Sequence, residues 1–137
     1  MALDPERYDN LSEFRYALRR FLAASEAINK AAGVTQQQYQ AMLAVRAWPS
    51  DPMATKDLAD QLLLTHHAAV QLVDRLEKLG LVERRGSSDD RRVVHLSLSA
   101  AGAAVLEDLV VKHLAEIRDQ EPQLSRSLDR IRRAGDK

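Results

Sequence analysis

The side chains with the most potential for chemistry lie on one stretch of the chain, residues 66–79. Its apolar residues recur at helical spacing, so the polar residues share the opposite face: His66, His67, Gln71, Asp74, Arg75 and Lys78. Glutamine can form two hydrogen bonds to an adenine edge, and histidine can reach bases or phosphates. The N-terminus of a helix also favours a phosphate. This face could therefore contact nucleic acid, although an ordinary solvated helix face would look the same.

Four arginines flank a short turn that follows this segment. Arg84 and Arg85 precede the turn, Arg91 and Arg92 follow it, and Asp90 lies within it. An arginine at the tip of a hairpin can enter a narrow minor groove, where the negative potential is enhanced. Asp90 could hold Arg92 in an extended conformation for such a contact. The alternative is ordinary ion pairing on a hairpin surface, which contributes about 0–1 kcal/mol.

The charge balance does not by itself favour nucleic acid as a partner. The chain of 137 residues has 20 Lys and Arg against 20 Asp and Glu, and residues 36–99 contain eight of each sign. Non-specific affinity for DNA comes mostly from neutralising phosphates, so binding would need basic groups gathered on one face. A dimer would double such a face. We expect weak non-specific binding with a modest dependence on salt.

The composition excludes several classes of protein. The chain has no cysteine, which excludes disulfides, thiol redox sensors, cysteine nucleophiles and zinc sites of the cysteine type. The longest apolar run, residues 100–106, is far shorter than the roughly 18 residues that a membrane span needs. The first residues lack the basic and apolar regions of a signal peptide. We therefore expect a cytoplasmic protein with no membrane partner.

No arrangement of residues indicates catalysis or a cofactor. His66 and His67 point about 100° apart on a helix, and no carboxylate cluster accompanies them. Asp89 and Asp90 are neighbours on a turn rather than a general acid and base facing a cleft. The sequence has neither a nucleophile elbow nor a Gly-rich phosphate loop. We predict that the chain is not an enzyme and has no catalytic residue, metal or cofactor.

Capping and breaker residues divide the chain into helices and a hairpin. Helices are predicted over residues 4–32, 35–48, 56–62, 66–79 and 100–119, with a last helix that Pro122 starts or interrupts. The expected N-caps are Thr35, Thr55, Thr65 and Ser99. Strands are predicted at residues 81–85 and 94–98. Two helices joined by a three-residue link and followed by a hairpin have the order of a winged helix-turn-helix. We therefore expect a mainly α fold with a small β-hairpin wing.

Two apolar patterns remain outside this domain. The first predicted helix, near seven turns long, has a stripe that a partner subunit could cover: Leu11, Phe14, Leu18, Phe21, Leu22 and Ile28. An apolar cavity between the first two helices could be lined by Phe14, Leu18, Phe21, Tyr39, Met42 and Trp48. Arg15 or Arg46 could then hold an anionic ligand. Stripes of this kind occur in any helical domain, so a plain core explains them better than a cavity.

Several motifs in order along the chain resemble those of the MarR family of bacterial transcription regulators. They are Thr55-Lys56-Asp57-Leu58-Ala59, the octapeptide VQLVDRLE at residues 70–77, and GLVER at residues 80–84. Asp90-Arg91-Arg92 followed by LSAAG at residues 98–102 resembles the signature D-R-R…L-T-x-x-G of that family. Ser99 stands where threonine is usual, and either residue can cap a helix. The resemblance covers essentially the whole chain.

The resemblance implies a homodimer that binds double-stranded DNA. Residues 1–34 and 100–137 would form a helical dimerisation region, and residues 35–99 a winged helix-turn-helix DNA-binding domain. The helix at 66–79 would enter the major groove and Arg92 the minor groove, with Asp90 orienting the wing arginines. The residues expected to contact DNA are Lys56, Thr65, His66, His67, Gln71, Arg75, Arg84, Arg85, Asp90, Arg91 and Arg92.

The resemblance also implies a repressor that a small anionic or phenolic ligand releases from a pseudo-palindromic operator in the bacterial cytosol or nucleoid. The ligand pocket would be lined by Phe14, Leu18, Met42, Arg46, Trp48 and His66. The absence of cysteine excludes the peroxide-sensing branch of that family, and no ligand cluster of the zinc-sensing branch is present. The alternative is a protein-interaction module that kept the fold and lost DNA binding, which the neutral charge allows.

Overall fold

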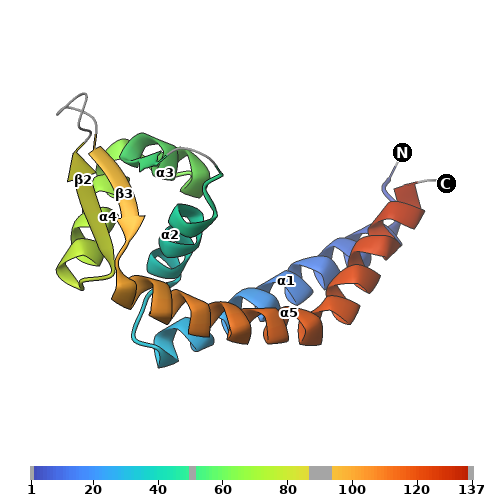
Figure 1. Ribbon diagram of the computed structural model, residues 1–137. Helices are drawn as coiled ribbons and strands as arrows, with labels where there is room; N and C mark the ends of the chain where they lie inside the picture. The colour runs from blue at the N-terminus through green and yellow to red at the C-terminus, as the bar shows by residue number, and fades with distance from the viewer. Residues whose placement is uncertain (1, 50–51, 87–93, 136–137) are drawn as a thin grey trace.

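The computed structural model describes residues 2–49, 52–86 and 94–135, which form a lobe and a projecting arm (Figure 1). The lobe contains α2 (Gln36–Ala47), β1 (Met53–Ala54), α3 (Thr55–Leu62), α4 (His66–Lys78), β2 (Val82–Gly86) and β3 (Val94–Leu98). The arm consists of α1 (Pro5–Ala31) and most of α5 (Ala100–Gly135), with both termini near its far end. This architecture confirms the predicted mainly α fold with a small β-sheet.

The helix-turn-helix is built by α3, a tight link and α4. The backbone of Leu63 has φ 57°, the left-handed conformation that ends many helices. The N–H of Leu64 donates to the carbonyl of Ala59 at 2.9 Å, and Ala59 is buried. Thr65 caps α4, because its hydroxyl accepts a hydrogen bond from the N–H of Ala68 at 3.1 Å. The predicted cap is confirmed.

The core of the lobe is made of aliphatic and methionine side chains. Its fully buried members include Met42, Met53, Leu58, Leu76 and Leu109, which come from α2, β1, α3, α4 and α5. The first turns of α5 therefore belong to the lobe, and the rest of that helix leaves it to form the arm. This packing fixes α4 with its polar face outward.

The sheet has one strand more than the sequence indicates. Its order is β1-β3-β2, and Met53 of β1 pairs with Leu96 of β3. Two-residue strands such as β1 have no alternation that could be recognised in a sequence. β2 and β3 pair antiparallel from Val82 opposite Leu98 to Gly86 opposite Val94, as predicted for the strands of the wing.

Two predicted helix boundaries are wrong. The N-cap of α3 is Ala54, not Thr55, and the N–H of Ala54 donates to the carboxylate of Asp57 at 3.0 Å. The side chain of Asp57, the third residue of α3, therefore caps the N-terminus of this helix by accepting a hydrogen bond from the backbone. At the other boundary α4 ends at Lys78, and Leu79 is 54% exposed rather than part of the apolar face.

α5 is one helix of 36 residues that passes through Pro122, which corrects the expected break. Proline has no N–H to donate to the carbonyl of Arg118, one turn earlier. Pro122 is exposed, so water can satisfy that carbonyl. Figure 1 shows α5 turning upward between its orange and red parts. The helix therefore bends near the proline instead of ending.

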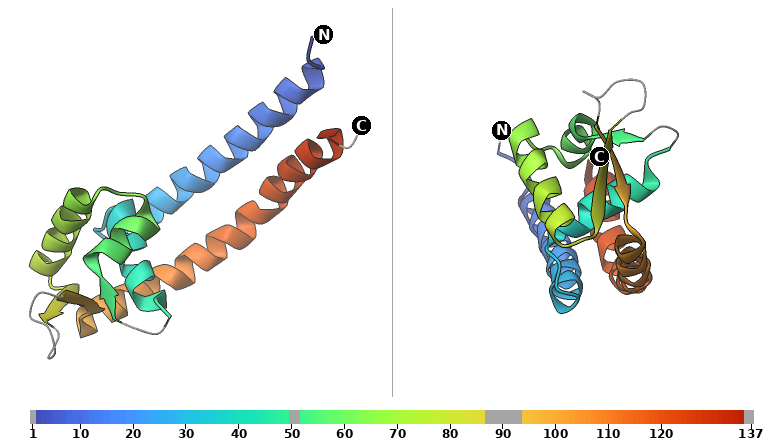
Figure 2. Two further views of the ribbon diagram at one scale, coloured as in Figure 1. Left: turned by 90° about the horizontal axis from the view of Figure 1, so that it is seen from above. Right: turned by 60° about the vertical axis from the view of Figure 1, so that its left-hand side comes forward.

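The arm leaves most of its apolar side chains uncovered within one chain. α1 and α5 lie side by side, as Figure 2 shows. The residues of α1 that are buried are small or polar: Asn10, Ala17, Ser25 and Asn29. The predicted stripe is at best half-buried, and Leu11 is 55% exposed. Ile28 packs against the core of the lobe, but the rest of the stripe is not part of a core formed by this chain alone.

A closed ring of hydrogen bonds lies where α1, α2 and α5 meet. His113 Nε2 contacts Asn29 Oδ1 at 2.8 Å, and Asn29 Nδ2 donates to Gln36 Oε1. Gln36 Nε2 donates to Ser25 Oγ at 3.0 Å, and Ser25 Oγ lies 3.3 Å from His113 Nδ1. Tyr39 stacks on the imidazole with 4.0 Å between ring centroids. A buried polar group is costly unless it is bonded, so this ring holds the three helices in one arrangement.

The ring makes the stability of the protein depend on pH. Burial lowers the pKa of His113 below 6.5, and the charge of Glu116 offsets part of this effect. The folded state therefore binds this proton less readily than the unfolded state does. The stabilisation is complete above pH 6.5 and is lost as the pH falls through the lowered pKa. We expect the free energy of unfolding, measured in urea, to decrease over this interval.

His113→Gln is expected to remove this part of the pH dependence. His95→Gln, which removes a histidine of β3, is the matched control and should keep it. Equal pH profiles for His113→Gln and the unchanged protein would contradict the assignment.

Candidate nucleic-acid interface

The exposed face of α4 holds the polar side chains predicted to contact nucleic acid. His67, Gln71 and Arg75 follow one another at intervals of four residues, so they form one row along the helix. All three are exposed, whereas Ala69, Leu72, Val73 and Leu76 on the opposite side are buried. His66 is exposed at the first turn, where the backbone N–H groups favour a phosphate. The structure thus brings the α4 residues together on one surface.

Arg84 joins β2 to the side of α4. Its guanidinium lies 2.7 Å from the carboxylate of Asp74 and 3.2 Å from that of Glu77. It also donates to the backbone carbonyl of Val70 at 3.3 Å. The side chain of Arg84 is only 24% exposed. Arg84 is therefore occupied with α4 and positions the helix against the strand.

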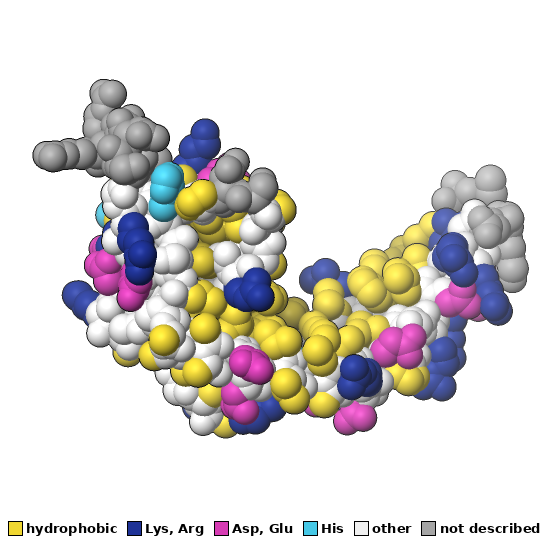
Figure 3. All heavy atoms as spheres, viewed as in Figure 1, with side chains coloured by type: hydrophobic (Ala, Val, Ile, Leu, Met, Phe, Trp, Pro, Cys, Tyr) yellow, Lys and Arg dark blue, Asp and Glu magenta, His cyan; other side chains and the backbone are white. Residues whose placement is uncertain are grey.

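This arrangement changes the electrostatics of the face. The two acidic residues of α4 that would repel a phosphate are both paired with Arg84. Among the described residues, no carboxylate forms an ion pair with Arg75 or Lys78. Figure 3 shows acidic and basic side chains next to each other on the part of the lobe formed by α4 and β2. The formally neutral domain therefore retains basic groups on its exposed helix face.

Other predicted contact residues lie around α4. Lys56 is exposed in the first turn of α3, and Thr65 is exposed at the start of α4. Arg85 is exposed near the end of β2, where it pairs with Glu83 at 3.0 Å and lies opposite His95 in the sheet. The remaining predicted residues, Asp90, Arg91 and Arg92, and also Asp89, lie outside the described residues. They belong to the seven residues that join Gly86 to Val94.

The six residues predicted to line a ligand pocket are not gathered in one place. Met42 is completely buried in the core of the lobe, and Trp48 packs against that core. Phe14 and Leu18 are half-buried on the arm and are not among the residues packed against this core. The side chains of Arg46 and His66 are exposed. Within one chain, Met42 and Trp48 are therefore better explained as core residues than as the lining of a ligand cavity.

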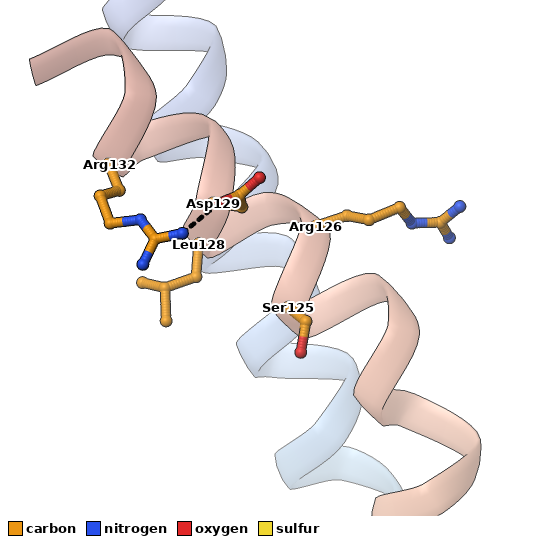
Figure 4. A pocket seen from close by; sticks show the side chains of 5 residues that line it. All are labelled: Ser125, Arg126, Leu128, Asp129 and Arg132. Atoms are coloured by element: carbon orange, nitrogen blue, oxygen red, sulfur yellow. Dashed lines mark hydrogen bonds and ion pairs between the residues drawn. The ribbon is translucent and has the colours of Figure 1, made fainter. Parts of the chain in front are cut away.

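The hollows on the arm do not have the form of an enclosed ligand site. One of about 440 Å³ lies on α5 and is lined by Ser125, Arg126, Leu128, Asp129 and Arg132. Figure 4 shows these side chains spread along the outside of the helix, with Arg126 directed away from the others and Arg132 paired with Asp129. The surface is open, and most of its lining residues are exposed.

Other site types receive no support from the described parts of the chain. No group of three or more His, Asp and Glu residues there could hold a metal ion. Within the same residues, none of the helices combines the length and the apolar character that crossing a bilayer requires.

Comparison with known proteins identifies the domain. The family model described as "MarR family" matches residues 32–93, which cover α2, α3, α4 and β2. The transcriptional repressor MprA of Escherichia coli is 30% identical over 81 residues, which are 59% of this chain and 46% of MprA. Over this domain, the chain is similar to proteins of the MarR family. The family resemblance of the motifs is thereby confirmed. Relatives named as transcriptional regulators also support the prediction that the chain is not an enzyme.

Solved structures of MarR-family proteins share the fold. AbsC, a MarR-family regulator from Streptomyces coelicolor, superposes with a TM-score of 0.77 at 20% identity, over 88% of this chain and 81% of AbsC. The MepR–DNA complex of S. aureus gives a TM-score of 0.74 at 20% identity, over 89% of each chain. These likenesses confirm the winged-helix fold. The chain spans about half the length of the curated relatives that it matches.

Two structural features of the chain have no counterpart in its sequence motifs. The hydrogen-bonded ring around His113 joins side chains that are up to 88 residues apart, so no local sequence pattern predicts it. Asp74 and Glu77 share one side of α4 because they are three residues apart, but their pairing with Arg84 depends on how β2 lies against that helix.

Proposed function

We propose that the chain is a homodimeric, sequence-specific DNA-binding regulator of transcription that acts as a repressor. The observation that carries the proposal is the row His67, Gln71 and Arg75 on α4, whose acidic neighbours are paired with Arg84. The name of MprA as a repressor and the DNA-bound state of MepR support it. Such a protein would work in the bacterial cytoplasm.

In the proposed complex, α4 lies in the major groove. Gln71 and Arg75 would read base edges, while Lys56, Thr65, His66 and His67 approach phosphates. Arg85, Arg91 and Arg92 would act from the wing, with Asp90 as the orienting carboxylate. A two-fold dimer would read half-sites about 10–10.5 base pairs apart. The test is binding to labelled duplex DNA, which should weaken between about 50 and 200 mM salt. No binding at the lower salt would contradict the proposal.

The arm is the proposed dimerisation region, made of residues 1–34 and 100–137. Its support is the apolar surface left uncovered on α1 and α5, which Figure 3 shows along the arm. The large exposed side chains there are Tyr8, Leu11, Tyr16, Leu22, Val111, Leu114, Ile117 and Leu128. A patch of this kind on a small protein is typical of a covered interface. The hollow of Figure 4 would then lie in or beside that interface.

A charged residue in this surface is expected to separate the protomers. Leu128→Glu places a carboxylate in the apolar interface, where an unpaired charge is costly. We expect light scattering to show a monomer, or at least a tenfold weaker dimer, a change of about 1.4 kcal/mol. Leu79→Glu is the matched control, since both leucines are 54% exposed and Leu79 lies on the lobe. A Leu128→Glu dimer as stable as the control would contradict the proposed interface.

A change at Arg84 is expected to weaken DNA binding although this side chain is occupied with α4. Arg84→Met leaves the carboxylates of Asp74 and Glu77 unpaired beside the phosphates, and we expect about a tenfold loss of affinity. Adding Asp74→Asn should restore part of it. Fluorescence anisotropy on a selected site measures both changes. If the double variant binds no better than Arg84→Met, then Arg84 acts by another route.

Release by a small anionic or phenolic ligand is the last part of the proposal. The predicted lining residues Phe14, Leu18, Met42, Arg46, Trp48 and His66 come from both the arm and the lobe, so the proposed pocket would lie between these two parts. A pocket there would require the second protomer or a movement of the lobe, because Met42 has no exposed surface. A panel of aromatic acids and phenols should include a compound that dissociates the DNA complex. Arg46→Ala should weaken the response to an acid more than the response to a neutral phenol.

A further inference from the structure

The ring of hydrogen bonds around His113 connects the lobe to the arm. Gln36 belongs to α2 of the lobe, whereas Ser25 and Asn29 belong to α1 and His113 to α5 of the arm. Figure 1 shows α2 standing over the place where α1 and α5 pass each other. His113 is only 5% exposed. The orientation of the lobe on the arm therefore depends in part on a buried imidazole.

A neutral imidazole satisfies every hydrogen bond of the ring. The carbonyl oxygen of Asn29 can only accept, so His113 Nε2 carries the hydrogen. Ser25 Oγ accepts from Gln36 Nε2, and its own hydrogen can go to His113 Nδ1 or to Gln36 Oε1, each 3.3 Å away. When this hydrogen goes to Nδ1, the four side chains form a closed cycle. In this arrangement each of the four side chains donates one bond and accepts one. A proton on Nδ1 would turn the Ser25 hydrogen toward Gln36 Oε1 and leave a positive charge buried among neutral side chains, which is costly.

No opposite charge within the ring would compensate the imidazolium. α1 faces it with Ser25 and Asn29, which do not titrate, and α2 faces it with Gln36 and Tyr39. Burial raises the pKa of Tyr39, so the phenol stays neutral. On α5 itself the carboxylate of Glu116 favours the charged form, but it accepts a hydrogen bond from Gln120 at 2.9 Å. Burial of His113 outweighs this carboxylate and lowers the pKa of the imidazole.

We propose that this ring is a proton-sensitive joint, closed when His113 is neutral and opened when a proton binds. The closed joint holds the lobe in one orientation on the arm. A lobe that is already oriented loses less conformational freedom when two copies bind DNA together. Acidification should therefore weaken DNA binding. This consequence rests on the proposed function, whereas the opening of the joint does not.

The expected direction of the change in DNA affinity distinguishes the joint from the histidines on α4. His66 and His67 lie on the face proposed to meet phosphates, where added positive charge strengthens binding. Added charge on that face would therefore act in the direction opposite to the opening of the joint. A loss of affinity in acid would therefore not come from added positive charge on the α4 face.

The first test compares DNA affinity at about pH 7.5 and about pH 5.5. The unchanged protein should bind more weakly in acid, by about tenfold for each unit by which the pKa of His113 differs between the closed and open joint. His113→Gln should lose this decrease, and His95→Gln should keep it. If His113→Gln shows the same decrease as the unchanged protein, the proposal is wrong.

The second test needs neither DNA nor a change at His113. Because the chain has no cysteine, Gln61→Cys on the lobe and Asp119→Cys on the arm can carry two spin labels without further changes. After dilution with unlabelled chains, the distance distribution should be narrow at the higher pH and broader or shifted at the lower pH. Identical distributions would overturn the joint. A pH-dependent distribution in a protein that binds no DNA would instead overturn the proposed function and leave the joint established.

Discussion

Replacing Gly102 by alanine should cost about 3 kcal/mol or more of the free energy of unfolding. Gly102 is buried in the first turn of α5, against the segment that leads from α4 into β2. A Cβ atom at this position would lie 2.0 Å from the carbonyl oxygen of Leu81 and 2.9 Å from its carbonyl carbon. Both groups are backbone, so no rotation of a side chain can relieve the overlap.

The hydrogen bonds around Gly102 prevent an easy shift of the helix. The N–H of Ser99 donates to the carbonyl of Leu81 at 3.1 Å, and the hydroxyl of Ser99 donates to Gly80 at 2.6 Å. The same hydroxyl accepts from the N–H of Gly102 at 2.9 Å. Moving α5 away would break these bonds together, which is why the expected effect is large compared with a total stability of roughly 5–15 kcal/mol.

Gly135→Ala is the matched control. Gly135 lies at the end of the same helix, and a Cβ there would meet nothing within 4 Å. Chemical denaturation should show this variant to be as stable as the unchanged protein. A Gly102→Ala protein that unfolds at the same urea concentration as Gly135→Ala would contradict the packing described for α5.

The double change Gln71→Ala and Arg75→Ala should lower affinity for a selected DNA site by about a hundredfold or more. Each base contact of this kind contributes about 1–3 kcal/mol, and a dimer loses the contacts in both half-sites. Both side chains are exposed on α4, so the fold should be retained. The loss should be larger for the selected site than for bulk DNA, because base contacts carry the sequence preference.

Lys112→Ala is the control for charge. It removes one positive charge, as Arg75→Ala does, but lies on the arm, where Lys112 pairs with Asp108 at 2.9 Å. Anisotropy titrations should show little change for it. An equal loss for the α4 double variant and for Lys112→Ala would mean that general charge, not the α4 face, determines binding.

Features with local signals could be predicted from the sequence. Thr35 and Gln38 form the reciprocal capping bonds at 3.0 Å that their spacing indicates, and Ser99 caps α5. Gly80 has φ 73° at the end of α4, as expected for the residue after a helix. These residues act on their own backbone or on residues a few positions away, so the local sequence is enough to predict their roles.

Features that depend on distant neighbours could not be predicted. Whether Pro122 ends a helix depends on the surroundings of the freed carbonyl, which follow from how α5 packs. Gly102 is required only because Leu81 passes over it. The occupation of Arg84 by Asp74 and Glu77 depends on how β2 lies against α4. For the site, the sequence therefore indicated which residues share α4, but not which of them are available to DNA.

The measurement that tests the central claim most directly is selection of binding sites from a random pool of duplex DNA by the purified protein. About 150 mM salt suppresses weak non-specific binding. Enrichment of a pseudo-palindrome with half-sites about ten base pairs apart is the predicted result. No enrichment at this salt or at lower salt, with protein freed of small molecules by refolding, would contradict DNA recognition and favour a module that binds other proteins.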